Sequence, residues 1–530
     1  MVSAAHPLAV DAGLEILRRG GSAVDAAIAV QFMLGFVEAP ETGIGGGGFL
    51  LYFDATGNQL EFLDGRETAP AAARPDRFQW LGRPAPAWIA VPSGRSVGVP
   101  GMVAMLELAH ARHGRLPWSE LLEPAIRAAQ DGVPMPPRLR AQARGDFSLR
   151  LFADVRERYV SPAGDSSPLL RNAEYAATLR LLADDPGAFY EGETAAALVA
   201  RAARRRPWGS DLAAADLRSY QAKLRQPVCG PYREWTVCGA PPPSSGGIAV
   251  LQVLGMLESF PLRELGPASV EALHLIVEAQ RLAFADRERF LGDPDFVAVP
   301  VAGLLDPAYL RERAAVIDPQ RAMRQVLHGT PPGDARPPTP VQPADPRGGT
   351  SHFTIVDAAG NAVALTGSIE APFGSRMASG GFLLNNQLTD FSFSPAAGDA
   401  AHPNAVAPGK RPRSSMSPVM VFDADGELRL AVGARGGPRI IAHVTRTLVA
   451  VLDWELELQE AINQPNFGHA GGRLELERGS PLAARQREFR ARGHRVREVE
   501  LASGLHGIER AGDGWRGGAD PRLDGTARGD

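Results

Sequence analysis

The segment from residue 330 to residue 349, TPPGDARPPTPVQPADPRGG, divides this chain into two parts. So many prolines with so few large apolar residues cannot form part of a core, so we expect the segment to be exposed and mobile. A β-like run, TSHFTIVD, begins directly after Gly348 and Gly349. The sequence therefore predicts a first region over residues 1–349, ending in a linker over 330–349, and a second region over residues 350–530.

The second region carries two β-hairpin signatures. SHFTIVD and NAVALTGS are separated by Ala-Ala-Gly, and SPVMVFD and ELRLAVG are separated by Ala-Asp-Gly. Short glycine-containing turns between apolar runs are typical of hairpins. GGPRIIAHVTRTLVAVLDW follows, and its proline near the first turn is typical of a helix start.

The first region begins with two predicted helices. One runs from about Pro7 to Arg19 and stops at a glycine pair. Ser22 then suits the cap of AVDAAIAVQFMLGFV, which is apolar nearly all round and is expected to be buried. Further helical patterns cover residues 102–113, 119–130 and 270–289. This order of helices, hairpins and a final helix predicts an α+β fold with sheets packed between helices in one domain.

Composition excludes two classes of protein. The chain has 530 residues, of which 44% are hydrophobic and 22% charged, as expected for a globular protein. Its net charge of −4 gives no overall field that favours nucleic acid. No run is long and apolar enough to span a bilayer.

The N-terminus and the cysteines bear on the compartment. MVSAAHPLAVDAGLEILRRGG lacks a basic start followed by an apolar block, so we expect no secretory signal in the sequence as given. We expect a cytoplasmic protein, or a periplasmic or extracellular one whose leader has been removed. Cys229 and Cys238 lie on a predicted hairpin with a Gly-Pro turn region, where they form either a disulfide or a pair of free thiols.

Familiar cofactor and metal motifs are missing. The glycines at 43 and 45–48 precede a strand and carry no lysine, which argues against a phosphate loop and favours close backbone packing or a turn. His110 and His113 have a helical metal-binding spacing but no third ligand. His352 is interpreted as a strand side chain, because adjacent strand residues point to opposite faces. We expect no metal and no organic cofactor.

Thr350 would become chemically special if the chain were cut before it. The new N-terminal residue would carry a hydroxyl and a free α-amine, whose pKa near 7.7–8.0 leaves much of it neutral at physiological pH. One residue would then supply both nucleophile and base. Glycines at 348 and 349 would let the backbone adopt the strained conformation in which the hydroxyl attacks the preceding carbonyl. A plain domain boundary is the alternative interpretation.

Several ordered motifs resemble the γ-glutamyltransferase (glutathione hydrolase) family of N-terminal-nucleophile hydrolases. The resemblance implies a four-layer αββα sandwich and a precursor that cleaves itself between Gly349 and Thr350. The large and small subunits would remain together as a heterodimer. The motifs, in order, are HPLA, GGSAVDAA, GIGGGGF, LDGRETAP, VPGMVAMLE, PPPSSGG, GGTSHFTIVD, FLLNNQLTDFS, KRPRSSMSP and GARGGPRI.

The resemblance also implies roles for individual residues. Thr350 matches the nucleophile, and Gly436 and Gly437 match an oxyanion hole, which suits two N–H groups opening a helix. Arg66 matches the arginine that binds the substrate α-carboxylate, a task for a planar two-pronged donor. The remaining matches are Ser414 and Ser415 for the same carboxylate, and Gln387 and Asp390 for the α-ammonium.

Three departures from the family pattern affect the expected chemistry. Ser368 stands where better-known members have a threonine hydrogen-bonded to the nucleophile. Glu370 stands where they have asparagine, or in some relatives glutamate, on the ammonium, which makes the pocket more anionic. The segment between Asp390 and Lys410 looks like a shortened lid without the aromatic residue that covers the donor. A more open site favours hydrolysis over transfer.

The expected function is therefore hydrolysis or transfer of γ-glutamyl groups from glutathione and related amides, through an ester on Thr350. One alternative keeps the machinery but acts on glutaryl-type side chains or γ-linked polymers. A second alternative is an unprocessed, non-catalytic binding protein. The expected partners are a small-molecule γ-glutamyl substrate and the chain's own second cleavage product, with no nucleic acid and no membrane span.

Overall fold

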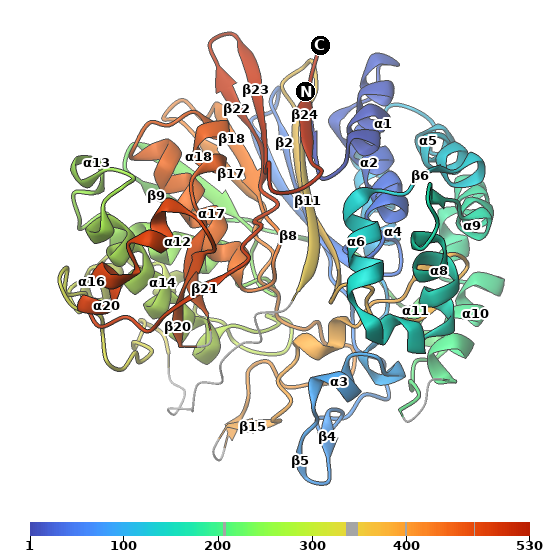
Figure 1. The fold of residues 1–530 in the computed structure, drawn as a ribbon, viewed down its shortest axis with the longest axis horizontal. Helices are drawn as coiled ribbons and strands as arrows, with labels where there is room; N and C mark the ends of the chain where they lie inside the picture. The colour runs from blue at the N-terminus through green and yellow to red at the C-terminus, as the bar shows by residue number, and fades with distance from the viewer. Residues whose placement is uncertain (205–207, 335–347, 398–399, 471) are drawn as a thin grey trace.

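The computed structural model describes residues 1–204, 208–334, 348–397, 400–470 and 472–530. Most of the predicted linker, residues 335–347, therefore lies outside the described part. Two β-sheets stand face to face at the centre, and helices cover the outer face of each sheet (Figure 1). The order of the four layers is helix, sheet, sheet, helix, as the resemblance implied.

The first sheet is built around the strand that begins at the predicted cleavage point. β11 (Gly349–Val356) pairs with β12 (Ala362–Glu370) as the predicted antiparallel hairpin, and β12 pairs in turn with β2 (Gly47–Asp54). Both chain ends join the same sheet, where their strands lie side by side (Figure 1). The sheet's order is β24 (Thr526–Arg528), β1 (Val2–Ala4), β11, β12, β2, β3 (Gln59–Gly65) and β8 (Lys223–Arg225).

The second sheet contains the other predicted hairpin. β17 (Val419–Phe422) and β18 (Leu428–Gly433) are antiparallel neighbours at its centre. The sheet's order is β23 (Gly514–Ala519), β22 (His506–Ala511), β18, β17, β10 (Trp235–Gly239) and β9 (Val228–Tyr232). The smaller pairings are β4 (Gln79–Trp80) with β5 (Arg83–Pro84), β6 (Val133–Pro134) with β7 (Leu169–Leu170), β13 (Ala378–Ser379) with β14 (Phe382–Leu383), β15 (Ala396–Ala397) with β16 (Ala400–Ala401), and β19 (Phe467–Ala470) with β20 (Arg473–Glu477) and β21 (Val496–Val499).

Helices from the first half of the chain cover the first sheet. α1 (Pro7–Arg18) and α2 (Ala23–Val37) begin and end where predicted, and the Ser22 side chain accepts from the N–H of Asp25 in a capping box. Every residue of α2 is buried, as its uniformly apolar sequence requires. The other helices on this side are α4 (Met102–His113), α5 (Trp118–Asp131), α6 (Pro137–Gly145), α8 (Ser161–Ala163), α9 (Ala173–Asp184), α10 (Gly192–Ala203) and α11 (Ala214–Arg218).

Helices of mixed origin cover the second sheet. α14 (Val270–Phe290) lies where predicted, and α17 (Arg439–Leu452) follows the Gly-Gly-Pro sequence with Pro438 at its cap. The remaining helices on this side are α12 (Gly246–Leu257), α13 (Leu262–Leu265), α15 (Val301–Leu304), α16 (Pro307–Ala314), α18 (Leu458–Asn463), α19 (Pro481–Ala484) and α20 (Gln486–Ala491).

Strand β2 shows why both faces of the first sheet are covered instead of one face being exposed to water. Alternate side chains point to opposite faces of a strand. Phe49 and Leu51 pack with the second sheet, whereas Leu50 and Tyr52 pack with the helices of the first half. Both faces of the first sheet are therefore apolar, and burying both requires a helical layer on one side and another sheet on the other.

The cysteine hairpin differs in one respect from the prediction. Cys229 on β9 and Cys238 on β10 lie directly opposite each other and form a disulfide, with an S–S distance of 2.06 Å. The turn, however, is not at Gly-Pro. Tyr232 pairs with Trp235 across a two-residue turn in which Arg233 has a φ of 54°, while Pro231 lies within the edge strand, where its missing N–H costs no ladder bond.

Within the described residues, we find no helix that is both long and apolar enough to cross a membrane.

Candidate active site

Two hydroxyl groups converge on the carbonyl that precedes Thr350. The Thr350 hydroxyl donates to the Gly349 carbonyl oxygen at 2.6 Å, and the Ser368 hydroxyl donates to the same oxygen at 2.6 Å. The two hydroxyl oxygens lie 3.3 Å apart, and both residues are buried. A carbonyl that accepts two hydrogen bonds is polarised, and the hydroxyl that would attack it is already adjacent.

The glycines before Thr350 are explained by close packing rather than by strain at Gly349. A Cβ on Gly348 would lie 2.8 Å from the Cα of Gly437, and a Cβ on Gly349 would lie 2.6 Å from a carboxylate oxygen of Glu41. Gly349 does not have a left-handed φ, so our expectation of a strained glycine is wrong there. Both glycines are needed because neighbouring groups leave no room for a side chain.

The strain lies instead on the opposite strand. The register between β11 and β12 shifts at Thr350, between the pairs Gly349–Glu370 and Ser351–Gly367. Glu370 takes a φ of 78°, which is unfavourable for a residue with a side chain. Its main-chain N–H donates to the Ser368 hydroxyl oxygen at 2.9 Å. This irregularity turns Thr350 and Ser368 toward the same carbonyl, which is a common use of a β-bulge beside a reactive group.

Gly436 and Gly437 lie beside Gly348, one residue before the Gly349–Thr350 peptide. Their φ angles are 117° and 59°, which glycine alone adopts without penalty. They connect the end of β18 to the start of α17, and the Gly437 backbone packs against Gly348. Main-chain N–H groups at a helix start are suited to stabilising a developing negative charge.

The glycine run at 43–48 brings a further residue to the site. A Cβ on Gly46 would lie 2.1 Å from the Ser368 carbonyl oxygen, so the run serves close backbone packing, as predicted. Glu41, just before the run, is 1% exposed and reaches the Gly349–Thr350 peptide. Sequence reasoning missed Glu41. The sequence contains one signal for Glu41, which is its position in EAPETG, next to the glycine run that packs against Ser368.

Charged residues gather at a second cluster close by. Arg66, which follows β3 and is fully buried, donates to Asp390 at 2.5 Å and to the main-chain carbonyl of Arg413 at 3.2 Å. Gln387 donates to the same Asp390 oxygen at 2.8 Å. Both Gln387 and Asp390 belong to the short 3₁₀ helix η5 (Gln387–Asp390). The predicted carboxylate-binding and ammonium-binding residues thus pair with each other here.

The two serines of RSSMSP have separate partners. The Ser414 hydroxyl oxygen accepts from the N–H of Met416 at 3.1 Å, and the Ser415 hydroxyl oxygen accepts from Arg287 at 2.7 Å. Arg287 is buried, and burial lowers its pKa to about 10. Arg413 and Arg287 share the buried carboxylate of Glu288. Arg287 is a second residue that sequence reasoning missed, because a basic residue in the last turn of a helix is an ordinary feature.

One chain segment connects the two clusters. The Asn386 side chain donates to the Glu370 carboxylate. The main-chain N–H of Asn386 donates to the carbonyl of Ile369 at 3.1 Å. Asn386 directly precedes Gln387, and Glu370 follows Ser368 by two residues. All of the predicted site residues are therefore brought into one continuous region: Arg66, Gly349, Thr350, Ser368, Glu370, Gln387, Asp390, Ser414, Ser415, Gly436 and Gly437.

The three histidines considered in the sequence, His110, His113 and His352, bond to protein partners. His352 lies within the sandwich and bonds the hydroxyls of Thr366 and Thr354, and burial holds its pKa far below the usual range. It is a strand side chain, as interpreted from the sequence. His110 bonds the carbonyl of Leu116 at 2.8 Å and His113 bonds Glu61 at 2.9 Å, so the pair does not converge on one point.

His274, Glu278 and His494 form a buried group of metal-ligand types. His274 donates through Nε2 to the carbonyl of Asp318 at 2.8 Å, so its Nδ1 accepts from His494 at 2.7 Å. Glu278 is ion-paired with Arg281 at 2.6 Å. Each of the three side chains already has a protein partner, so these hydrogen bonds and the ion pair account for the cluster.

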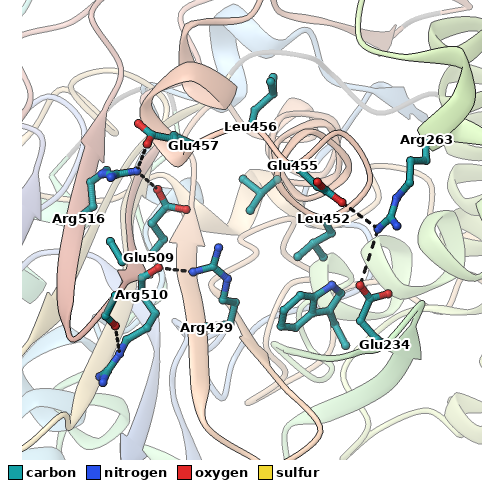
Figure 2. A pocket seen from close by; sticks show the side chains of 14 residues that line it. Glu234, Arg263, Arg429, Leu452, Glu455, Leu456, Glu457, Glu509, Arg510 and Arg516 are labelled. Carbon is teal, nitrogen blue, oxygen red and sulfur yellow. Dashed lines mark hydrogen bonds and ion pairs between the residues drawn. The ribbon is translucent and has the colours of Figure 1, made fainter.

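The described cavity of about 750 Å³ lies elsewhere, beside the start of β18 (Figure 2). Acidic and basic side chains line it in pairs. Arg263 bridges Glu234 and Glu455, and Arg516 lies between Glu457 and Glu509. Gly436 follows the opposite end of that strand, so this cavity is separate from the Thr350 site.

Comparisons with known proteins agree with this geometry. The sequence profile of the family described as gamma-glutamyltranspeptidase matches residues 9–529. The chain is 36% identical to the glutathione hydrolase proenzyme of Bacillus subtilis (strain 168) over 479 residues, covering 88% of this chain and 80% of that protein. It is 36% identical to the acylase ACY 1 proenzyme of Pseudomonas sp. (strain SE83), covering 99% and 92%.

Among solved structures, the cephalosporin acylase from Bacillus halodurans superposes with a TM-score of 0.86 at 27% identity, covering 99% of this chain and 94% of that one. This likeness extends over all four layers and supports the αββα assignment. The chain belongs to the γ-glutamyltranspeptidase family and is an enzyme of that family.

Proposed function

We propose that the protein is a self-cleaving γ-glutamyl hydrolase and transferase whose nucleophile is Thr350. The observation that carries the proposal is the convergence of the Thr350 and Ser368 hydroxyls on the Gly349 carbonyl, each at 2.6 Å. Such an arrangement serves no evident packing purpose. It is the geometry that an attack by Thr350 on its own preceding peptide requires.

Self-cleavage would proceed through an ester. The Thr350 oxygen attacks the Gly349 carbonyl carbon, forming a new C–O bond, and the C–N bond to Thr350 breaks. The hydroxyl proton passes to the leaving nitrogen, which becomes the α-amine. Water then hydrolyses the ester, giving chains 1–349 and 350–530. After cleavage β11 and β12 would belong to the small chain and β2 to the large chain. The pairing of β12 with β2 within one sheet would hold the two chains together as a heterodimer.

Turnover would reuse the same atoms. The Thr350 α-amine, with a pKa near 7.7–8.0 when unperturbed, accepts the hydroxyl proton. The oxygen attacks the γ-glutamyl amide, the amine leaves with that proton, and a γ-glutamyl ester remains. Water or an amino-acid amine then takes the acyl group. Gly436 and Gly437 are proposed to donate N–H groups to the oxyanion, because they pack against Gly348, directly before the reacting position.

The charged cluster would bind the glutamyl head group. An α-amino acid presents a carboxylate and an ammonium on one carbon. Arg66 and Asp390 lie side by side with opposite charges, 2.5 Å apart, so each can exchange its partner for one of those groups. Ser414 and Ser415 are proposed to support the carboxylate, and Gln387 and Glu370 the ammonium. Glutathione and similar γ-glutamyl amides have the required head group.

Hydrolysis is proposed to exceed transfer. The segment after Asp390 includes Phe393, but this ring stacks on Phe78 at 4.7 Å in a separate small cluster. The ring is therefore held against Phe78 and is not proposed as a cover over Thr350. Residues 398–399 of the proposed lid lie outside the described part of the chain. Access for water from this side would favour hydrolysis of the ester.

A glutaryl-type acylase is the second candidate, favoured by the close superposition on the cephalosporin acylase. Rates on γ-glutamyl and glutaryl anilides distinguish the two. Because a glutaryl group has no α-ammonium for Asp390, we expect the γ-glutamyl anilide to react at least tenfold faster. A clear preference for the glutaryl anilide would assign the protein to the acylases instead.

A further inference from the structure

Glu41 is a buried carboxylate held beside the Thr350 nitrogen. Its Oε1 accepts from Arg138 at 3.0 Å and from Gln142 at 2.7 Å. Its Oε2 lies 2.7 Å from Arg435 and next to the Gly349–Thr350 peptide. The Thr350 N–H is near enough to lower the pKa of this carboxyl, although no donor among the described residues is well aligned with Oε2.

The unaligned oxygen has a consequence for cleavage. Oε2 has its ion pair with Arg435 but no well-aligned hydrogen-bond donor among the described residues. Cleavage would convert the single N–H of Thr350 into an amine or ammonium, whose hydrogens can turn toward Oε2. The cleaved chain can therefore satisfy an oxygen that the uncleaved chain leaves without an aligned partner.

A second buried carboxyl, Glu38, decides which group carries the charge. Burial raises the pKa of both Glu38 and Glu41, that of Glu38 to about 8. Glu41 contacts both Arg138 and Arg435, whereas no direct ion pair of Glu38 is described. The two arginines beside Glu41 favour its ionised form over that of Glu38.

We propose that Glu41 is the counter-ion of the Thr350 α-amine, orienting that amine toward the Thr350 hydroxyl during turnover. This inference rests on the proposed function. It adds a residue from the first region of the chain to a nucleophile in the second. Because Glu41 would act through the Thr350 amine, it is a positioning residue for that amine.

The proposal predicts an effect on pH dependence with a definite sign. A carboxylate beside an amine favours its protonated form and so raises the pKa of the amine. Only the neutral amine can act as base, so kcat/KM falls as pH drops through that pKa. Removing the Glu41 charge lowers the amine pKa, and the acidic limb moves to lower pH. The charged groups around this site that stay unchanged are Arg138 and Arg435 beside Glu41, Glu370 on the paired strand, and Glu38 with Asp524 near it.

The test compares pH profiles of kcat/KM on γ-glutamyl p-nitroanilide for the mature wild type and variants. We expect Glu41→Gln to move the acidic limb down by about one pH unit, with a lower plateau. Glu41→Asp keeps the charge at a greater distance and should move the limb the same way by less. Glu38→Gln is the matched control, and below pH 8 its limb should stay in place.

Each outcome bears on the proposal. A Glu41→Gln protein that melts normally but stays as one chain, while Glu38→Gln matures, supports the contact at the cleavage step. An unmoved limb in either mature Glu41 variant overturns the proposal, and so does failure of both variants to fold, which would make Glu41 a structural ion-pair residue. Thr350→Ala separates the two inferences: if it stays active, the nucleophile assignment is at fault rather than Glu41.

Discussion

The two ends of the candidate site are built from different chemistry. Around Thr350 the interacting groups are mostly hydroxyls and main-chain atoms, supplied by Ser368, Gly349 and the Gly436–Gly437 loop. Around Arg66 they are charged side chains, paired with one another. Groups of the first kind can act on any acyl carbon, including the chain's own peptide, whereas groups of the second kind select by charge.

This difference predicts a division of effects. Changes at the nucleophile end should impair both self-cleavage and turnover, because the same atoms serve both. Changes at the charged end should leave self-cleavage intact and alter turnover alone, because the scissile peptide carries no α-carboxylate or α-ammonium. Each variant below can therefore be scored twice, once by the fraction of cleaved chain and once by the rate on substrate.

Thr350→Ala should have the largest effect. It removes the proposed nucleophile, so self-cleavage should stop and glutamate release should fall by a factor of about 10³ or more. Thr350→Ser keeps a hydroxyl and should retain measurable cleavage. Gel analysis and a glutamate assay on the same preparations provide both readings. If the alanine variant still cleaves itself, Thr350 does not serve both self-cleavage and turnover.

Arg66→Lys should come next, with kcat/KM lower by about a hundredfold and cleavage close to normal. Lysine keeps the charge but loses the planar fork that binds a carboxylate with two parallel hydrogen bonds. Because Arg66 also donates to the carbonyls of Pro412 and Arg413, the melting temperature must be measured alongside. Loss of cleavage in a protein of normal stability would show that the two ends are not separable.

Asp390→Asn should reduce kcat/KM for the γ-glutamyl anilide by about thirtyfold, equivalent to the ~2 kcal/mol of a charge-assisted hydrogen bond. The rate on the glutaryl anilide should change little, since that substrate lacks the ammonium. The ratio of the two rates is the sharper measure, because a general loss of folded protein cancels in it. An unchanged ratio would remove Asp390 from ammonium recognition.

Ser368→Ala should have the smallest effect. It removes one neutral hydrogen bond to the Gly349 carbonyl, so we expect self-cleavage to slow by about fivefold, in line with ~1 kcal/mol. Ser368→Thr restores the hydroxyl and serves as the control. Cleavage rates follow from the time course of full-length chain after synthesis. Equal rates for all three proteins would mean that this hydroxyl does not polarise the carbonyl.

The elements of the fold could be predicted where the signal is local. Helix α2 follows from its capping serine and its apolar sequence, and both main hairpins follow from their glycine turns. Each of these signals lies within a few residues of the element that it determines. The cysteine hairpin was harder because Gly230 and Pro231 mimic a turn within a short edge strand. Its true turn, at Arg233, depends on a positive φ that arginine rarely adopts.

The site was predictable only in part. Arg66 and Asp390 were found through family motifs, but their mutual ion pair joins residues 324 positions apart and has no sequence signal. Glu41 was missed for the same reason, since only the folded chain brings it to Thr350. The glycines before Thr350 were correctly singled out, yet the reason at Gly349 is contact with Glu41, not backbone strain.

Intact mass combined with N-terminal sequencing of the purified protein tests the central claim most directly. The account predicts two chains, the smaller beginning Thr-Ser-His-Phe, and one uncut chain for Thr350→Ala. A single full-length chain in active wild-type protein would contradict it, because no free α-amine would then exist on Thr350.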